Sequence, residues 1–450
     1  MPACRPKTRG YLQSNGTTMW TSDPAQTPGN LTCPFCGLAC DDLSVAPGPD
    51  AGLVLVNGCR TARSAFAWAM AAGAGAALID GQPVSLEAAL THAAELLAAA
   101  RAPLFGGLVT DVNGMRAVLD LADLRGALLD HVAADALFRN LLVLQDGGWM
   151  TATLTEVRNR ADLILVLGRE VPHRFPRLCE RVLLPPEALF SPPAERRLVL
   201  LGPAKPGPLP AELAAANPTL IPVALADLAG VGALLRGLIA GRPVRADAVP
   251  GVAGEQLTRL ADWLRDARYA VVTWAAGELA FPHAELTVQA FVELVRDLNR
   301  TTRAAALPLA GTLGDLTANQ VCTWQTGYPL RSGRQQGRSR YEPLLYRHQD
   351  LLAREQSDLL LWVQALPAAN PAATPAAKCP TIVLGYPGLV CGQVPDVFIP
   401  VGLPGIDHPG HWYRTDAVCP LPLGQVRDLG LASVAGVIGM LSERLGATAN

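Results

Sequence analysis

The sequence reads LEAALTHAAELLAAA at residues 86–100 and PLFGGL at residues 103–108, and these two runs indicate the fold class. In the first run Leu90, Ala94 and Leu97 recur at helical spacing, which predicts a helix with one apolar face. The second run is short and apolar, which predicts a buried strand. A helix followed closely by a buried strand is typical of an α/β protein with a parallel sheet.

The same alternation continues along the chain. Short apolar runs bounded by Gly or Pro predict strands, and amphipathic runs between some of them predict helices. We expect strands at 127–132, 162–168, 197–201, 219–225, 269–274, 357–364, 380–385 and 397–401, and helices at 254–267 and 283–300. Three segments have the composition of linkers: 203–210, 332–340 and 367–380. The middle one is rich in Arg and Gln and is expected to be a solvated loop.

The length of the chain predicts more than one lobe. It has 450 residues, whereas a single hydrophobic core stops growing at about 250–300. The predicted fold is therefore α/β and multi-lobed, with parallel sheets wrapped by helices. We expect a disordered leader at 1–30, a small cysteine module at 31–60, α/β lobes at 61–202 and 203–380, and a C-terminal segment packing on the lobes at 381–450.

The composition restricts the possible partners. Charged residues make up 17% of the chain, against a typical ~25%. So little charge favours a protein that covers much of its surface with partner chains. The net charge is −2, from 37 basic and 39 acidic residues, which argues against a nucleic-acid or anionic-membrane partner.

No stretch of the sequence predicts a membrane span or an export signal. The best candidate span, residues 65–79, is mostly Ala and Gly and is too short to cross a bilayer. The N-terminal region contains Arg5, Lys7 and Arg9 but lacks a following apolar stretch and a twin-arginine pair. We therefore expect a cytoplasmic, reducing location. The ten cysteines there favour metal binding or packing over disulfides.

Four cysteines form the sharpest motif. Cys33, Cys36 and Cys40 lie within eight residues on a turn that contains Gly37, and Cys59 follows after 18 intervening residues. Four converging thiolates suit an iron–sulfur cluster or a structural zinc ion. The spacing does not decide between them, and reduced cysteines without a ligand are the remaining alternative. We predict a metal site at these four residues.

Four stretches carry a resemblance to a known family. They read CPFCGLACDD at 33–42, GCR at 58–60, EVRNRAD at 156–162 and NQVCTWQTGYP at 319–329. These stretches are similar to the B subunit of formylmethanofuran dehydrogenase, a member of the molybdopterin oxidoreductase superfamily. The resemblance extends from about residue 32 to the C-terminus.

The resemblance implies both a fold and a set of cofactors. The superfamily builds several α/β lobes around a tungsten or molybdenum ion held by two pterins. By resemblance, Cys33, Cys36, Cys40 and Cys59 correspond to ligands of a [4Fe–4S] cluster that feeds electrons to that centre.

The chain departs from the family where the family holds its metal. Ala136 corresponds to the cysteine or selenocysteine that ligates the metal, Leu137 to a neighbouring histidine, and Ala310 to an arginine. A methyl group cannot coordinate tungsten, and leucine has no proton to transfer. The pterin-holding loops are also altered, to GREVP at 168–172 and GPAKP at 202–206. We therefore expect no molybdopterin or tungstopterin, and no catalytic or cofactor-binding residues apart from the cysteine site.

These departures suggest the bacterial counterpart of the family, the formyltransferase/hydrolase complex. Its subunits transfer a formyl group from tetrahydromethanopterin to a methanofuran-like carrier and release formate, and its B-type subunit has no redox task. We predict a redox-inactive B subunit, a pseudoenzyme of one-carbon metabolism in methylotrophy, with the sister subunits as partners. One alternative is an active tungsten or molybdenum dehydrogenase subunit that uses another ligand, such as Asp135. The other is an iron–sulfur electron-transfer module without a pterin.

Overall fold

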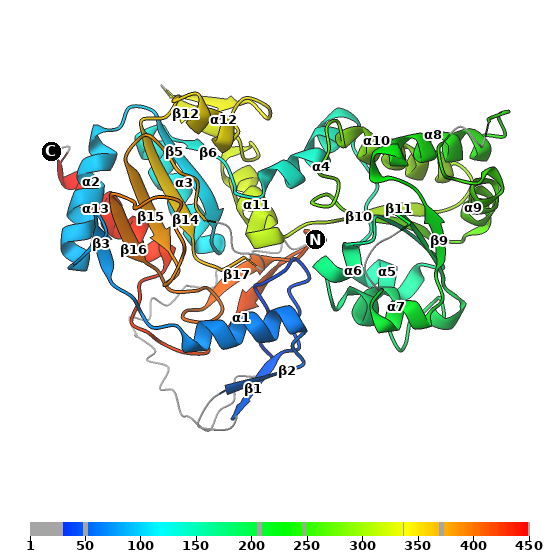
Figure 1. Ribbon diagram of the computed structural model, residues 1–450, viewed down its shortest axis with the longest axis horizontal. Helices are drawn as coiled ribbons and strands as arrows, with labels where there is room; N and C mark the ends of the chain where they lie inside the picture. The colour runs from blue at the N-terminus through cyan, green and yellow to red at the C-terminus, as the bar shows by residue number, and fades with distance from the viewer. Residues whose placement is uncertain are drawn as a thin grey trace, which may run out of the picture.

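The computed structural model describes residues 30–47, 53–204, 209–245, 249–335, 337–368 and 373–448. The leader expected at residues 1–30 lies outside this part of the chain, except for its last residue. The described chain forms two α/β lobes, at the left and right of Figure 1, with a small antiparallel module below and between them. The predicted α/β class, with parallel sheets wrapped by helices, is confirmed.

The first lobe is built on a mixed sheet that has nine strands within the described residues. Their order is β13-β12-β6-β5-β14-β15-β16-β3-β4. The run from β6 to β16 is parallel, and antiparallel pairs form both edges. The bounds are β3 Ala77–Ile79, β4 Gln82–Val84, β5 Pro103–Val109, β6 Leu128–Leu129, β12 Ser332–Gln335, β13 Arg338–Tyr341, β14 Leu359–Gln364, β15 Thr381–Gly385 and β16 Val397–Pro400.

Helices cover the first lobe's sheet. Phe105 of β5 belongs to a core shared with α2, α3 and α13, whereas its neighbour Leu104 belongs to the core on the opposite face. Both faces are therefore buried, which is why the strand reads as an unbroken apolar run. The helices of this lobe are α1 Arg60–Ala71, α2 Leu86–Ala99, α3 Val112–Arg125, α11 Asp315–Thr326, α12 His348–Ala353 and α13 Val434–Thr448.

The second lobe has a sheet of five strands in the described part of the chain, all parallel, in the order β11-β10-β7-β8-β9. Leu165 of β7 packs with α8, α9 and α10, while Ile164 faces α5, α6 and α7. The strands are β7 Leu163–Leu167, β8 Arg197–Gly202, β9 Thr219–Pro222, β10 Ala270–Ala275 and β11 Ala304–Leu309. The helices are α5 Leu154–Arg160, α6 Val171–Arg174, α7 Ala211–Ala215, α8 Leu228–Ile239, α9 Gly254–Asp266 and α10 Glu285–Leu298. Helix α4 Ala134–Gly147 runs between the two lobes and contributes to the cores of both.

Two short antiparallel pairs complete the fold. Strands β1 Ser44–Pro47 and β2 Leu53–Val56 belong to the cysteine module, and β17 Gly410–Tyr413 pairs with β18 Pro420–Leu423. Among the described residues, no helix is both long enough and apolar enough to cross a membrane.

The sheets divide the chain differently from the expected lobes at 61–202 and 203–380. Strands β7 and β8 pair with β10 in the second lobe, although the first lobe was expected to extend to residue 202. Strands β14 to β16 pair with β5 in the first lobe, so residues 381–450 contribute strands to its sheet as well as packing on it. The chain leaves the first lobe after β6, and it returns at α11. Local periodicity shows where strands are but not which strands pair.

The expected solvated loop at 332–340 is also wrong. This segment forms the antiparallel hairpin β12–β13 at the edge of the nine-stranded sheet. The residues of β13 are exposed or half-buried, so they are polar and lack the apolar alternation that marks a half-buried strand.

Candidate functional site

The four predicted cysteines surround one pocket. Cys33 and Cys40 lie at the two ends of a turn closed by a hydrogen bond from the Cys33 amide to the Cys40 carbonyl oxygen (2.9 Å). Cys59 caps the start of α1, where its sulfur accepts a hydrogen bond from the Ala62 amide (3.4 Å). All four thiols line a pocket together with Leu38, Leu43, Ala62, Pro176 and Arg177. The structure thus brings the four cysteines of the motif to one pocket.

Burial keeps Cys33, Cys36 and Cys40 protonated when no metal is bound. It raises the pKa of Cys36 to about 12 and that of Cys40 to about 11, and it raises the pKa of Cys33 well above its usual value. Neighbouring thiols add to the effect at Cys33 and Cys36, whereas Arg181 and Arg177 oppose it at Cys40. Metal binding at this site would therefore release protons.

The donor set fits either predicted group, because four thiolates ligate both [4Fe–4S] clusters and structural zinc. As placed, no three His, Cys, Asp or Glu side chains in the described residues are grouped closely enough to hold a single metal ion. The metal itself therefore stays a prediction.

The cysteine turn packs directly on a loop between the lobes. A Cβ atom added to Gly37 would lie 1.8 Å from the carbonyl oxygen of Ala310, so only glycine fits at this position. Thr415 ties the two segments together: its amide donates to the Gly37 carbonyl oxygen (2.6 Å), and its hydroxyl accepts from the Ala310 amide (2.8 Å).

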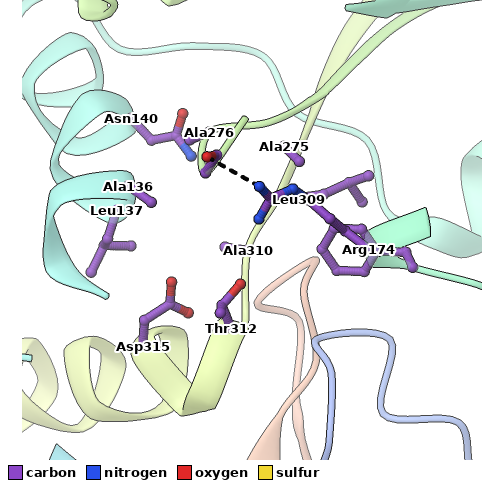
Figure 2. A pocket seen from close by; sticks show the side chains of 12 residues that line it. Ala136, Leu137, Asn140, Arg174, Ala275, Ala276, Leu309, Ala310, Thr312 and Asp315 are labelled. Carbon is purple, nitrogen blue, oxygen red and sulfur yellow. Dashed lines mark hydrogen bonds between the residues drawn. The ribbon is translucent and has the colours of Figure 1, made fainter. Parts of the chain in front are cut away.

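A second pocket lies on the other side of that loop (Figure 2). Ala136 and Leu137 of α4 form one wall, and Ala310 lies opposite them. The structure thus brings together the three positions that the resemblance aligns with the family's metal ligand, histidine and arginine. Their side chains here are apolar, and the enclosed space has room for about one water molecule. These residues do not fit a tungsten or molybdenum ion ligated as in the family.

Polar groups that sequence reasoning missed also line this pocket. Asp315 at the start of α11 is 2% exposed and points into the pocket, as Figure 2 shows. Asn140 accepts a hydrogen bond from the Trp274 indole (2.9 Å), and Arg174 donates to the Gly277 carbonyl oxygen (3.4 Å). The local sequence signal for Asp315 is its position directly after the glycine-containing loop 311–314, at the start of a helix.

Burial raises the pKa of Asp315 to about 7, although backbone amides of Gly311, Leu316 and Thr312 donate to the carboxylate and oppose the shift. The folded state therefore holds this proton more tightly than the unfolded chain, whose carboxyl has a pKa near 3.8. The resulting stability is fully present below about pH 3.8 and is lost as the pH rises through 7.

We expect Asp315→Asn to flatten the pH dependence of the unfolding free energy, because a side-chain amide does not titrate in this range. Relative to wild type, the variant should gain up to a few kcal/mol of unfolding free energy between pH 5 and 8. Urea unfolding at several pH values measures the difference, with Asp120→Asn, an exposed carboxyl on α3, as the control. Parallel curves for the Asp315 variant and wild type would contradict the expectation.

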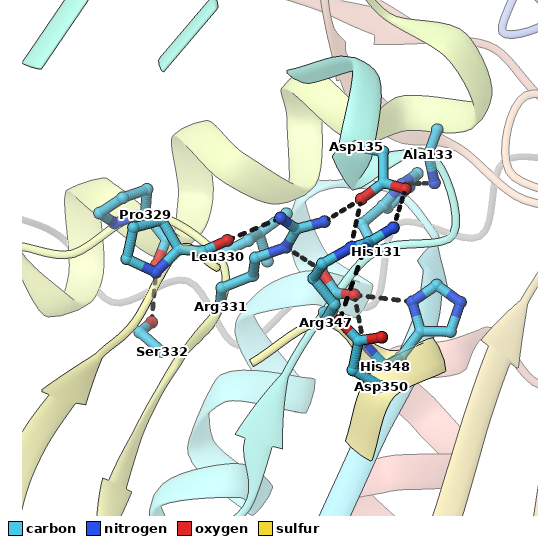
Figure 3. Close-up of polar contacts among 12 residues, drawn as sticks. His131, Ala133, Asp135, Pro329, Leu330, Arg331, Ser332, Arg347, His348 and Asp350 are labelled. Atoms are coloured by element: carbon cyan, nitrogen blue, oxygen red, sulfur yellow. Dashed lines mark hydrogen bonds and ion pairs between the residues drawn. The ribbon is translucent and has the colours of Figure 1, made fainter. Parts of the chain in front are cut away.

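Asp135, the alternative metal ligand considered above, is held by two arginines (Figure 3). It pairs with Arg347 (2.7 Å) and with Arg331, a side chain only 3% exposed. Burial raises its pKa, but hydrogen bonds from Arg347 and Arg331 outweigh this and lower the pKa to about 2. Asp135 is not among the residues that line the second pocket. The geometry therefore gives no support to Asp135 as a ligand there.

A buried histidine joins α4 to the loop of the second pocket. The Ala133 amide donates to His131 Nδ1 (2.9 Å), so Nε2 carries the proton and donates to the Leu313 carbonyl oxygen (3.1 Å). Burial lowers the pKa of His131 to about 4, which keeps this arrangement neutral. The bond supports Leu313, a non-glycine residue with a positive φ of 53°.

Comparisons with known proteins agree with the family resemblance and with this fold. The chain is 28% identical over 412 residues to the B subunit of tungsten-containing formylmethanofuran dehydrogenase 2 of Methanocaldococcus jannaschii, covering 89% of this chain and 93% of that protein. It is 31% identical over 330 residues to the B subunit of the formyltransferase/hydrolase complex of Methylorubrum extorquens, covering 73% and 86%. No protein-family model matches the chain.

A solved structure is similar as well. The crystal structure of the Methylorubrum extorquens formyltransferase/hydrolase complex with methylofuran contains a chain that matches with a TM-score of 0.71 and 28% identity. The match covers 83% of this chain and 99% of that one. The two α/β lobes and the cysteine module thus define a chain of the same structural type as that subunit. Within that type, the chain belongs to the family of formylmethanofuran dehydrogenase B subunits, which includes the B subunit of the formyltransferase/hydrolase complex.

Proposed function

We propose that this chain is a redox-inactive B subunit of a formyltransferase/hydrolase complex in one-carbon metabolism. The observation that carries the proposal is the second pocket, which is lined by Ala136, Leu137 and Ala310, the residues that the resemblance aligns with the family's metal ligand, histidine and arginine. Reduction of carbon dioxide at a metal needs a ligand for that metal and a group that moves protons. None of these three side chains can do either.

In this role the chain is a structural subunit without a catalytic centre of its own. Its two lobes would contact the sister subunits that carry out formyl transfer and hydrolysis. The low content of charged residues supports such burial of surface. The similarity to a chain of the four-subunit FhcABCD complex supports the same partners.

The alternative is an active dehydrogenase subunit that interconverts carbon dioxide and formylmethanofuran. It is favoured by two relatives named as tungsten-containing enzymes, at 28% and 27% identity over 89% and 92% of this chain. It requires a metal ligand in place of Ala136. Asp135 is the adjacent candidate, and its carboxylate is already paired with Arg331 and Arg347.

Elemental analysis of the anaerobically purified complex distinguishes the two functions. Cells are supplied with both tungstate and molybdate, and an archaeal formylmethanofuran dehydrogenase serves as the positive control. We expect tungsten and molybdenum at background level in the complex that contains this chain. A stoichiometric amount of either metal per copy would overturn the proposal.

A further inference from the structure

A residue of the second lobe closes the cysteine pocket. All four thiols come from residues 33–59, but Pro176 and Arg177 line the same pocket from the segment that follows α6. In the described part of the chain, Arg177 is the one lining residue with a permanent charge.

Arg177 is held rigidly at this position. Its two terminal nitrogens bind both oxygens of Asp42 (2.6 and 2.8 Å), its Nε pairs with Glu180, and the side chain is 15% exposed. Such a two-pronged pair fixes the guanidinium plane as well as its position. Asp42 lies two residues after Cys40, so the ion pair joins the cysteine turn to the second lobe.

A buried four-thiolate metal centre would be stabilised by a fixed positive charge beside it. Four thiolates around one zinc ion or one [4Fe–4S] cluster leave a net negative charge, and burying an unpaired charge is costly. A fixed guanidinium nearby offsets that charge, and its N–H groups can donate to sulfur, as outer partners of metal ligands commonly do.

We propose that Arg177 is a positioning residue for the metal centre at Cys33, Cys36, Cys40 and Cys59, so that a stable metal site requires the second lobe to be docked on the cysteine module. The inference rests on the proposed metal site. Metal occupancy at the four cysteines then depends on Arg177, which belongs to the second lobe and not to the cysteine module.

The chain offers a matched control. Arg181 crosses the same interface and pairs with Asp41 (2.7 Å) and Asp42 (2.5 Å), but it does not line the pocket. Arg181→Gln therefore weakens the docking and removes a charge that acts on Cys40, but it leaves in place the guanidinium that lines the pocket. Arg177→Lys keeps a charge but loses the two-pronged pair.

The experiment measures iron, sulfide and zinc in the anaerobically purified complex, and the rate at which a chelator removes the metal. We expect Arg177→Gln to lose metal roughly tenfold faster than wild type, since one charge-assisted interaction is removed. Arg177→Lys should fall between them, and Arg181→Gln should lose metal more slowly than Arg177→Gln. If Arg177→Gln does not fold, as judged by circular dichroism, Asp42→Asn takes its place, because it frees the guanidinium from its two-pronged partner.

The other possible outcomes test the role of Arg177 and the metal site separately. Equal metal retention in wild type and Arg177→Gln overturns the inference and leaves the metal site standing. An equal loss in Arg181→Gln and Arg177→Gln also overturns it, because docking and nearby charge then explain the effect without a special role for Arg177. A wild-type protein that holds neither iron nor zinc, even after reconstitution with ferrous iron and sulfide or with zinc ions, overturns the metal site and the inference together.

Discussion

Replacing Gly37 with alanine is expected to lower the unfolding free energy by about 3 kcal/mol or more. The added Cβ would meet the carbonyl oxygen of Ala310 at 1.8 Å, and a backbone atom cannot rotate away as a long side chain could. Thr415 binds both segments, so the cysteine turn cannot move off the loop without breaking those hydrogen bonds. Urea unfolding of the variant measures the loss.

The control for this substitution is Gly439→Ala in α13, where a Cβ would meet nothing within 4 Å. That change should be neutral or slightly stabilising, because alanine is the better helix former by about 0.5–1 kcal/mol. If Gly37→Ala were as stable as Gly439→Ala, the close packing of the module on the pocket loop would be refuted.

The second large effect is expected at Arg196, a buried cation that binds backbone carbonyl groups. It is 7% exposed and donates to the carbonyl oxygens of Arg158 (2.8 Å), Ala161 (2.8 Å), Val182 (3.0 Å) and Leu183 (2.6 Å). Burial lowers its pKa to about 10, with Asp162 opposing the shift. The side chain thus joins the end of α5 to the turn at residues 179–183.

Arg196→Met keeps the length of the side chain but leaves these carbonyl groups without a donor. We expect a loss of about 3–5 kcal/mol, because each buried unsatisfied group costs about 1–3 kcal/mol. Arg300→Met, at a side chain 76% exposed, should cost less than about 1 kcal/mol. Thermal and urea unfolding compare the two variants, and similar small losses would show that water replaces Arg196.

Much of the secondary structure follows from the sequence because each central strand is buried on both faces. The apolar runs at β5, β7, β10, β14 and β15 are visible without any knowledge of pairing. Helix α2 is equally visible from its apolar face, and its cap at Ser85 fixes the start. The hairpin β12–β13 was missed, because edge strands with charged, exposed side chains carry no such signal.

The assignment of strands to lobes could not be read from the sequence. Strand β5 pairs with β14, about 250 residues later, while β7 lies between them in the sequence and joins the other sheet. Local periodicity carries no information on pairing at this range, and the hydrophobic character of all three strands is the same.

The candidate site could likewise be predicted only in part from the sequence. The cysteine motif lies mostly in one short stretch, so its convergence was predictable, and the resemblance placed Ala136, Leu137 and Ala310 together. Asp315 and Arg177 were missed, because their roles arise from elements that meet only in the folded chain.

The path of the chain between its lobes also sets the order in which they can form during synthesis. When residue 309 has left the ribosome, every strand of the five-stranded sheet is present, and that lobe can fold as a unit. Strand β5 emerges earlier but must wait for β14 at residues 359–364, and α13 arrives only with the last residues. The half-built first lobe therefore exposes apolar strand edges throughout translation of the second, the interval in which a nascent chain most needs protection by chaperones.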